Sequence, residues 1–278
     1  MMIASNQPAE VLLDNQWMEV HIELPHAQIA ILDKVAQIRW QVSVPERCGE
    51  VAFLLEGRQR ELVYGLGCEG KRGVLFDNNY YMVRSSEWED YHDVSLIGGL
   101  GDDESTRVNL RLLLSETEPL LHFFCYVDGT RDEWVRRIQF PEGLVTPGGA
   151  HNRVWLPPDV KQIKDLSEEE LGAKMWQPPL DQDHSIAGAP FFLATQREEE
   201  RASTCLGYLH HPLTLLHIQR QGEAGQVVTP LTNRPAETGM SEDHPFQFSL
   251  QLFPNDDLTA ALWLAREFLF QEQTSIGL

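Results

Sequence analysis

Three histidines lie within eleven residues of the segment GYLHHPLTLLH, at positions 210, 211 and 217. A zinc ion requires three or four protein ligands that converge on one point. Alternate residues of a β-strand face the same side, so His210 and His211 are expected to point in opposite directions. Pro212 then interrupts the strand before His217. We therefore expect three separate side chains near a strand end, and we expect neither a metal nor another cofactor.

The segment SSEWEDYHD, residues 85–93, is the densest mixture of carboxylates and aromatic rings in the chain. Tryptophan and tyrosine rings stack on the C–H faces of sugars, and carboxylates bind sugar hydroxyls. The residue types predict a sugar-binding site made of Trp88, Glu89, Tyr91 and His92. The alternative is a solvated loop in which Trp88 covers the edge of the core.

A second polar segment, RPAETGMSEDHPF at residues 234–246, contains Glu237, Glu242 and His244. A glutamate and a histidine that face one cleft can act as a general acid and a general base. The alternative is a run of solvated acids, which is common in a chain this acidic. The chain has no GxSxG motif, so a serine-hydrolase interpretation lacks support.

The composition narrows the class of protein. The chain has 278 residues, 42% of them hydrophobic, and a formal net charge of −20. So negative a chain repels phosphate backbones, which argues against nucleic-acid binding. The four cysteines, at positions 48, 68, 125 and 205, form no CxxC pair, so we expect reduced and mostly buried thiols. We find no apolar run of membrane-spanning length and no signal peptide, so we expect a cytoplasmic protein without a membrane partner.

Most of the chain alternates apolar and polar residues in segments of strand length. Clear examples are WMEVHIEL (17–24), KVAQIRWQVSV (34–44), RVNLRLLL (107–114), LLHFFCYV (120–127) and FQFSLQLF (246–253). Many strands without long helices between them predict an antiparallel sandwich and not a βαβ fold. With no linker or internal repeat, residues 1–278 are expected to form one all-β domain.

Two segments predict helices. SEEELGAK (167–174) begins with the capping box Ser167 and Glu170, which indicates a short surface helix. NDDLTAALWLAREFLFQEQ (255–273) has one apolar face and predicts an amphipathic helix over about 256–272. Its Trp263, Phe268 and Phe270 widen the apolar surface beyond one stripe. This excess predicts that the sandwich covers one side of the helix and a partner another.

The order of several motifs resembles a known family. The motifs are DEWVRRIQFPEGL (132–144), WLPPDVKQIKDLS (155–167), MWQPP (175–179), APFFLATQ (189–196), GYLHHP (207–212) and FPNDDLTAALWLAREFLF (253–270). Together they resemble the β-supersandwich domain, related to galactose mutarotase, that precedes the catalytic barrel in large glycoside hydrolases. The polar strand corner of that family is matched by Gly207, Tyr208 and His211, and its exit helix by Asp256, Asp257, Trp263 and Arg266.

The resemblance implies a large antiparallel β-supersandwich that binds carbohydrate or supports structure without catalysis. Such a module would belong to a glycoside-hydrolase-like protein, and its partners would be a sugar and a catalytic barrel domain or a second copy of the chain. The ligand-binding residues would be Trp88, Glu89, Tyr91, His92, His211 and Glu242.

Two alternatives remain open. The first is a mutarotase-like epimerase, since those enzymes use a histidine acid and a glutamate base on one sugar. His211 would then be the acid and Glu237 the base, with His92 and Glu242 as the other candidates. The second is a structural interaction protein that uses the C-terminal helix.

Overall fold

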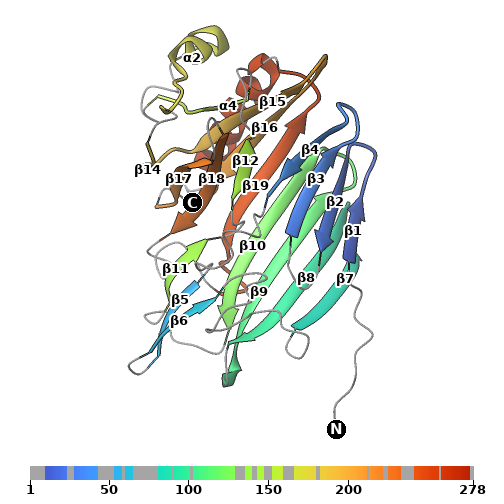
Figure 1. Cartoon of the computed structure of the whole chain (residues 1–278), viewed down its shortest axis with the longest axis vertical. Coiled ribbons are helices and arrows are strands. Elements are labelled where there is room, and N and C mark those ends of the chain that lie inside the picture. The colour runs from blue at the N-terminus through green and yellow to red at the C-terminus, as the bar shows by residue number, and fades with distance from the viewer. Residues whose placement is uncertain are drawn as a thin grey trace.

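Two antiparallel β-sheets make up most of the molecule (Figure 1). The computed structural model describes residues 10–23, 28–42, 53–57, 60–64, 81–88, 90–100, 103–128, 135–139, 143–146, 152–158, 166–179, 182–211, 213–221, 225–232, 241–256 and 258–275. Over these residues the all-β prediction is confirmed.

The first sheet has eleven strands in the described part of the chain. Nine follow one path, in the order β1 (Glu10–Asp14), β2 (Met18–Glu23), β3 (Gln28–Asp33), β4 (Ile38–Gln41), β12 (Leu144–Thr146), β18 (Gly225–Thr232), β11 (Val135–Gln139), β5 (Phe53–Gly57) and β6 (Arg60–Tyr64). A branch from β18 adds β17 (Leu215–Gln221) and then β14 (His184–Ala187).

The second sheet has eight described strands. Their order is β13 (Arg153–Trp155), β15 (Phe191–Glu198), β16 (Arg201–Leu209), β19 (Phe246–Phe253), β10 (Leu120–Asp128), β9 (Asp103–Ser115), β8 (Tyr91–Leu100) and β7 (Tyr81–Trp88). Every pair of neighbouring strands is antiparallel.

The main core fills the space between the two sheets. Along β10, Leu121, Phe123 and Cys125 are buried in this core, whereas the alternate residues His122 and Phe124 are only half-buried. A fully buried phenylalanine or leucine contributes about 1.5–3 kcal/mol. The period of two in LLHFFCYV therefore assigns one face of β10 to the core and leaves the other facing outward.

The two described cysteines, Cys125 and Cys205, are free and buried, as the sequence predicted. Burial raises the pKa of both thiols, so they are inert neutral groups at neutral pH. Cys48 and Cys68 lie outside the described residues.

A buried chain of hydrogen bonds ties the two sheets together. Nε1 of Trp40, on β4, donates to Oγ of Ser203 on β16 at 3.0 Å. The Ser203 hydroxyl donates in turn to Oδ2 of Asp33 on β3 at 2.7 Å. Because an unsatisfied buried polar group costs about 1–3 kcal/mol, this chain favours one alignment of the sheets.

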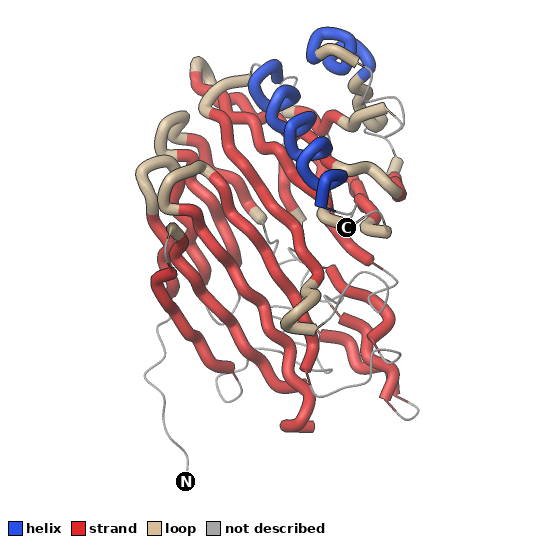
Figure 2. Tube along the Cα trace, turned by 180° about the vertical axis from the view of Figure 1, so that it is seen from behind, coloured by secondary structure: helices blue, strands red, loops and turns tan. Residues whose placement is uncertain are grey.

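Two described helices pack on the outer side of the second sheet. α4 (Leu258–Ser275) crosses the outer face of this sheet in Figure 2, and α2 (Glu168–Lys174) packs beside it. Ala261, Leu262 and Ala265 of α4 are buried in a second apolar cluster with residues of β15 and β16. The predicted Ser167–Glu170 capping box is present at α2. The predicted C-terminal helix is present as α4, so both helix predictions are confirmed. Within the described residues, neither helix combines the length and the hydropathy that a membrane span needs.

β7 (Tyr81–Trp88) and β8 (Tyr91–Leu100) pair as antiparallel strands and do not form the solvated loop considered above. The Cα atoms of Trp88 on β7 and Tyr91 on β8 are cross-strand partners. Asp90 has a φ of 74°, a left-handed conformation that aspartate tolerates better than most residues. The sequence did not predict β8, because polar residues begin YHDVSLIGGL and glycines end it.

Gly207 marks a close approach within the second sheet. A Cβ atom at this position would overlap the ring of Phe192, its cross-strand partner on β15. Phe192 in turn stacks on Phe248 of β19, with ring centroids 6.1 Å apart. The glycine of the GYLHHP motif therefore has a packing role.

Candidate functional site

The register of the second sheet aligns side chains from five strands in one row. Asp93 of β8 pairs with Leu113 of β9, and Leu113 pairs with His122 of β10. His122 pairs with Ser249 of β19, and Ser249 pairs with Tyr208 of β16. Cross-strand partners share one face of a sheet. Because Leu121 and Phe123 point into the core, the row lies on the outer face.

The centre of this row is a serine hydroxyl shared by two histidines. Nδ1 of His122 lies 2.6 Å from Oγ of Ser249, and Nε2 of His210 lies 2.7 Å from the same atom. A hydroxyl carries one proton, so it donates to one ring and accepts from the other. The Ser249 side chain is almost wholly buried, whereas both histidines are half-buried. Ser249 therefore couples the tautomers of the two rings.

His122 is a neutral imidazole at neutral pH. Burial, and secondarily the proximity of His210, lowers the pKa of His122 to about 4. Its Nδ1 is used by Ser249, and its Nε2 has no hydrogen-bond partner among the described residues. His122 therefore offers one oriented, uncharged nitrogen to a ligand.

Aromatic rings surround His122 on the same face. The ring centroids of Tyr91 and Phe124 both lie 6.0 Å from that of His122. On the other side, the ring of Phe268 from α4 meets His210 edge-on, with centroids 5.1 Å apart. Phe268 also contacts Tyr208, with centroids 4.3 Å apart. α4 thus packs directly against His210 through Phe268.

An ion pair completes the site. Arg111 is the cross-strand partner of Phe124, and its Nε lies 3.0 Å from both carboxylate oxygens of Asp93. Its Nη2 donates to Oδ2 of Asp93 at 2.8 Å. This bidentate geometry holds both charged groups in place. We refer to the following residues as the outer cluster: Tyr91, Asp93, Arg111, His122, Phe124, His210 and Ser249.

Two residues of the segment SSEWEDYHD lie in the outer cluster: Tyr91, which belongs to the predicted sugar-binding site, and Asp93. His92 is the cross-strand partner of Leu114, a core residue, so it lies toward the opposite face of β8 from Tyr91. There its Nε2 lies 3.9 Å from Oε1 of Glu116. Trp88 is the backbone partner of Tyr91, while Glu89 lies outside the described residues.

His211 lies in the turn after β16, where its Nδ1 accepts the backbone N–H of Leu213 at 3.1 Å. Its carbonyl accepts the N–H of Thr214 at 2.9 Å. Its neighbour His210 reaches His122, with ring centroids 6.5 Å apart. The catalytic and binding roles suggested for His211 remain predictions.

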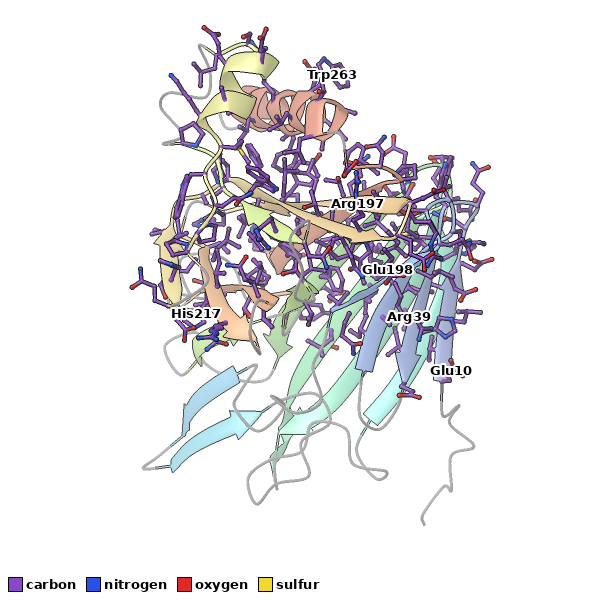
Figure 3. All side chains as sticks on the ribbon, turned by 45° about the horizontal axis from the view of Figure 1, so that its top comes forward. Glu10, Arg39, Arg197, Glu198, His217 and Trp263 are labelled. Atoms are coloured by element: carbon purple, nitrogen blue, oxygen red, sulfur yellow. The ribbon has the colours of Figure 1, made fainter. Side chains whose placement is uncertain are left out.

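Of the remaining predicted site residues, Glu242 and Glu237, the structure describes only Glu242. Glu242 is exposed in the turn before β19, and Glu237 lies outside the described residues. His217 lies on β17 of the first sheet, where its Nδ1 is 2.8 Å from Oγ of Ser185 (Figure 3). The three histidines of GYLHHPLTLLH are therefore dispersed, as expected. Among the described residues, no three His, Cys, Asp or Glu side chains are grouped as metal ligands.

Sequence reasoning missed His122, Ser249 and Arg111. A signal for His122 exists, because it alternates with Leu121 and Phe123 and must face outward. Nothing in the sequence shows that His122 and Ser249 are cross-strand partners, since 127 residues separate them.

Comparisons with known proteins establish the fold. No protein-family model matches the sequence, and no curated protein matches it. Among solved structures, the chain is similar to the α-N-acetylgalactosaminidase NagBb from Bifidobacterium bifidum in its GalNAc complex. The TM-score is 0.64 and the identity 8%, over 94% of this chain and 39% of that one. It is also similar to the GH36 α-galactosidase AgaA from Geobacillus stearothermophilus, with a TM-score of 0.50 and 10% identity, over 88% of this chain and 41% of that one.

The chain thus spans about two fifths of the length of these glycoside hydrolases. The similarity to part of these longer chains confirms, at the level of the fold, the β-sandwich domain that the resemblance in the sequence implied. At such low sequence identity, the roles of residues in those enzymes cannot be transferred to this chain.

Proposed function

We propose that this chain is a carbohydrate-recognition module of a glycoside-hydrolase-like protein and that the outer cluster holds the sugar. The observation that carries the proposal is the neutral, oriented imidazole of His122 between the rings of Tyr91 and Phe124. A sugar needs an apolar ring face for its C–H groups and fixed hydrogen-bonding groups for its hydroxyls. The outer cluster has both.

The charged residues of the outer cluster support binding more than hydrolysis. Glycoside hydrolases typically cleave with two carboxyl groups about 5–10 Å apart. Asp93 is the one residue of the outer cluster, as defined above, that carries a carboxyl group. Arg111 binds this group in a bidentate manner. A bidentate arginine–carboxylate pair is instead suited to holding sugar hydroxyls in a defined geometry.

The fold supports the same proposal. The two solved glycoside hydrolases contain this sandwich as two fifths of a longer chain. We propose that the module acts beside a catalytic barrel domain and that α4 lies at that junction. Trp263 of α4 is 53% exposed and points away from the sheets (Figure 3), which leaves apolar surface for such a partner.

Isothermal calorimetry with neutral mono- and oligosaccharides tests the proposal on the full chain. We expect measurable binding of at least one of them, and a loss of about tenfold in affinity for His122→Ala, as for one lost hydrogen bond and ring contact. His217→Ala is the matched control, since it removes a half-buried histidine from the other sheet. If no sugar produces a measurable heat of binding, the proposed binding function is wrong and only a structural role is left.

A further inference from the structure

The described charges at the outer cluster are already paired. Arg111 donates three hydrogen bonds to the Asp93 carboxylate, so its positive charge is neutralised locally. The side chain of Asp93 is only 8% exposed and that of Arg111 is 23% exposed, so solvent screens this pair poorly. A ligand therefore meets a salt bridge and not an available cation.

His122 adds no cation at neutral pH, because burial lowers its pKa to about 4. Both imidazoles point a nitrogen at the same Ser249 hydroxyl, and the ring centroids are 6.5 Å apart. A second positive charge at this distance, in a half-buried position, is unfavourable. The geometry thus favours a neutral His122 ring, in agreement with the low pKa of His122.

Two carboxylates and a second arginine lie on the turn between β9 and β10 and on α4. Glu118, in the turn between β9 and β10, is exposed, and after burial it is the second cause of the raised pKa of Tyr208. On α4, Glu267 is exposed, and Arg266 is half-buried with interactions of its own. The chain as a whole carries a net charge of −20.

We infer that the outer cluster selects uncharged sugars and rejects sugars that carry a carboxylate or a sulfate. The inference rests on the proposed function and specifies the chemical class of its ligand. An anionic substituent would lose hydration beside Asp93 and would meet Arg111 already paired with that carboxylate, which is costly. Discrimination of this kind arises from an unfavourable contact with the wrong ligand and not from a better contact with the right one.

Matched sugar pairs test the inference by calorimetry at pH 7. The probes are galactose with galacturonate and glucose with glucuronate, each presented as its methyl glycoside. We expect the neutral member of at least one pair to bind, and its acid to bind at least about tenfold more weakly. Equal or tighter binding of the acid overturns the inference but leaves the proposed function standing. If no member of either pair and no neutral oligosaccharide binds, the proposed function fails as well.

The variant Asp93→Asn locates the cause of the selectivity. It keeps the shape of the side chain and frees the charge of Arg111. We expect the ratio of neutral-sugar affinity to uronate affinity to fall at least about fivefold. Asp243→Asn is the control, because it makes the same charge change at an exposed residue in the turn before β19, and its ratio should stay as in the wild type. Equal ratios in the wild type and Asp93→Asn overturn the inference.

A second variant tests the same inference if Asp93→Asn does not fold. Glu118→Gln removes an exposed carboxylate near Tyr208 and should be tolerated. We expect its affinity ratio to fall about twofold, in the same direction, with an unchanged melting temperature. A ratio that does not fall in a folded Glu118→Gln protein contradicts the electrostatic origin of the selectivity.

Discussion

His122 and His210 share one hydrogen-bonding partner, although β10, which carries His122, and β16, which ends just before His210, are not neighbours. β19 lies between β10 and β16, and the Ser249 hydroxyl of β19 bonds to a ring nitrogen of each histidine. Since 88 residues separate the two histidines in the chain, only the strand order brings them together. This arrangement makes the state of one ring depend on the other.

The low pKa of His122 predicts a loss of stability in mild acid. Its pKa is about 4 in the folded protein and 6.5 in the unfolded chain, so the unfolded state binds more protons between these values. The contribution of His122 to stability is thus full above pH 6.5 and declines as the pH falls toward 4, by up to about 3 kcal/mol. Urea denaturation from pH 7 to pH 4 should show a smaller decline for His122→Gln than for the wild type. Parallel curves for the two proteins would contradict this prediction.

Ser249→Ala should destabilise the protein by about 1–3 kcal/mol, because it leaves a nitrogen of each half-buried histidine without its partner. The matched control is Ser185→Ala, whose hydroxyl also bonds to a histidine but is exposed. We expect that control to change the free energy of unfolding by less than about 0.5 kcal/mol. Chemical denaturation at pH 7 measures both, and similar values for the two variants would refute the structural importance of the shared hydroxyl.

Phe268→Ala should weaken sugar binding without removing a group that contacts the sugar directly. Phe268 packs on His210 and Tyr208, so its loss frees the end of α4 and the ring of His210. We expect affinity to fall about three- to tenfold by calorimetry, and Phe268→Leu to recover part of it. Trp263→Ala is the control on the same helix, because Trp263 is exposed, and it should bind as the wild type does.

Gly207→Ala should destabilise the sandwich by about 1–3 kcal/mol, since the new methyl group overlaps the buried ring of Phe192. Gly172→Ala provides the comparison. There the methyl group would lie 3.4 Å from Leu262, and alanine favours the helix. Thermal unfolding should show a lower melting temperature for the first variant only. A neutral Gly207→Ala would mean that the Phe192 ring can move at little cost.

The mutarotase-like alternative predicts faster anomerisation of freshly dissolved α-glucose or α-galactose, followed by polarimetry. We expect the protein to leave the spontaneous rate unchanged, because Asp93 is the one carboxylate of the outer cluster and Arg111 binds it in a bidentate manner. If the rate rises and His211→Ala or Glu237→Gln abolishes the rise, the alternative replaces the binding function.

The sequence by itself determined the fold class, the helices and the faces of the strands. LLHFFCYV and FQFSLQLF alternate with the period of 2 that a strand requires, and the Ser167–Glu170 capping box marks the start of a helix, whose period is 3.6. These signals depend on residues close together in the sequence and on backbone geometry alone. The tertiary structure alone decided the candidate site. Strand order and register place Asp93, His122, Ser249 and Tyr208 in one row, while they send Tyr91 and His92 to opposite faces. Register depends on how two whole sheets pack around one core, and a shift of one residue would move every side chain of a strand to the other face.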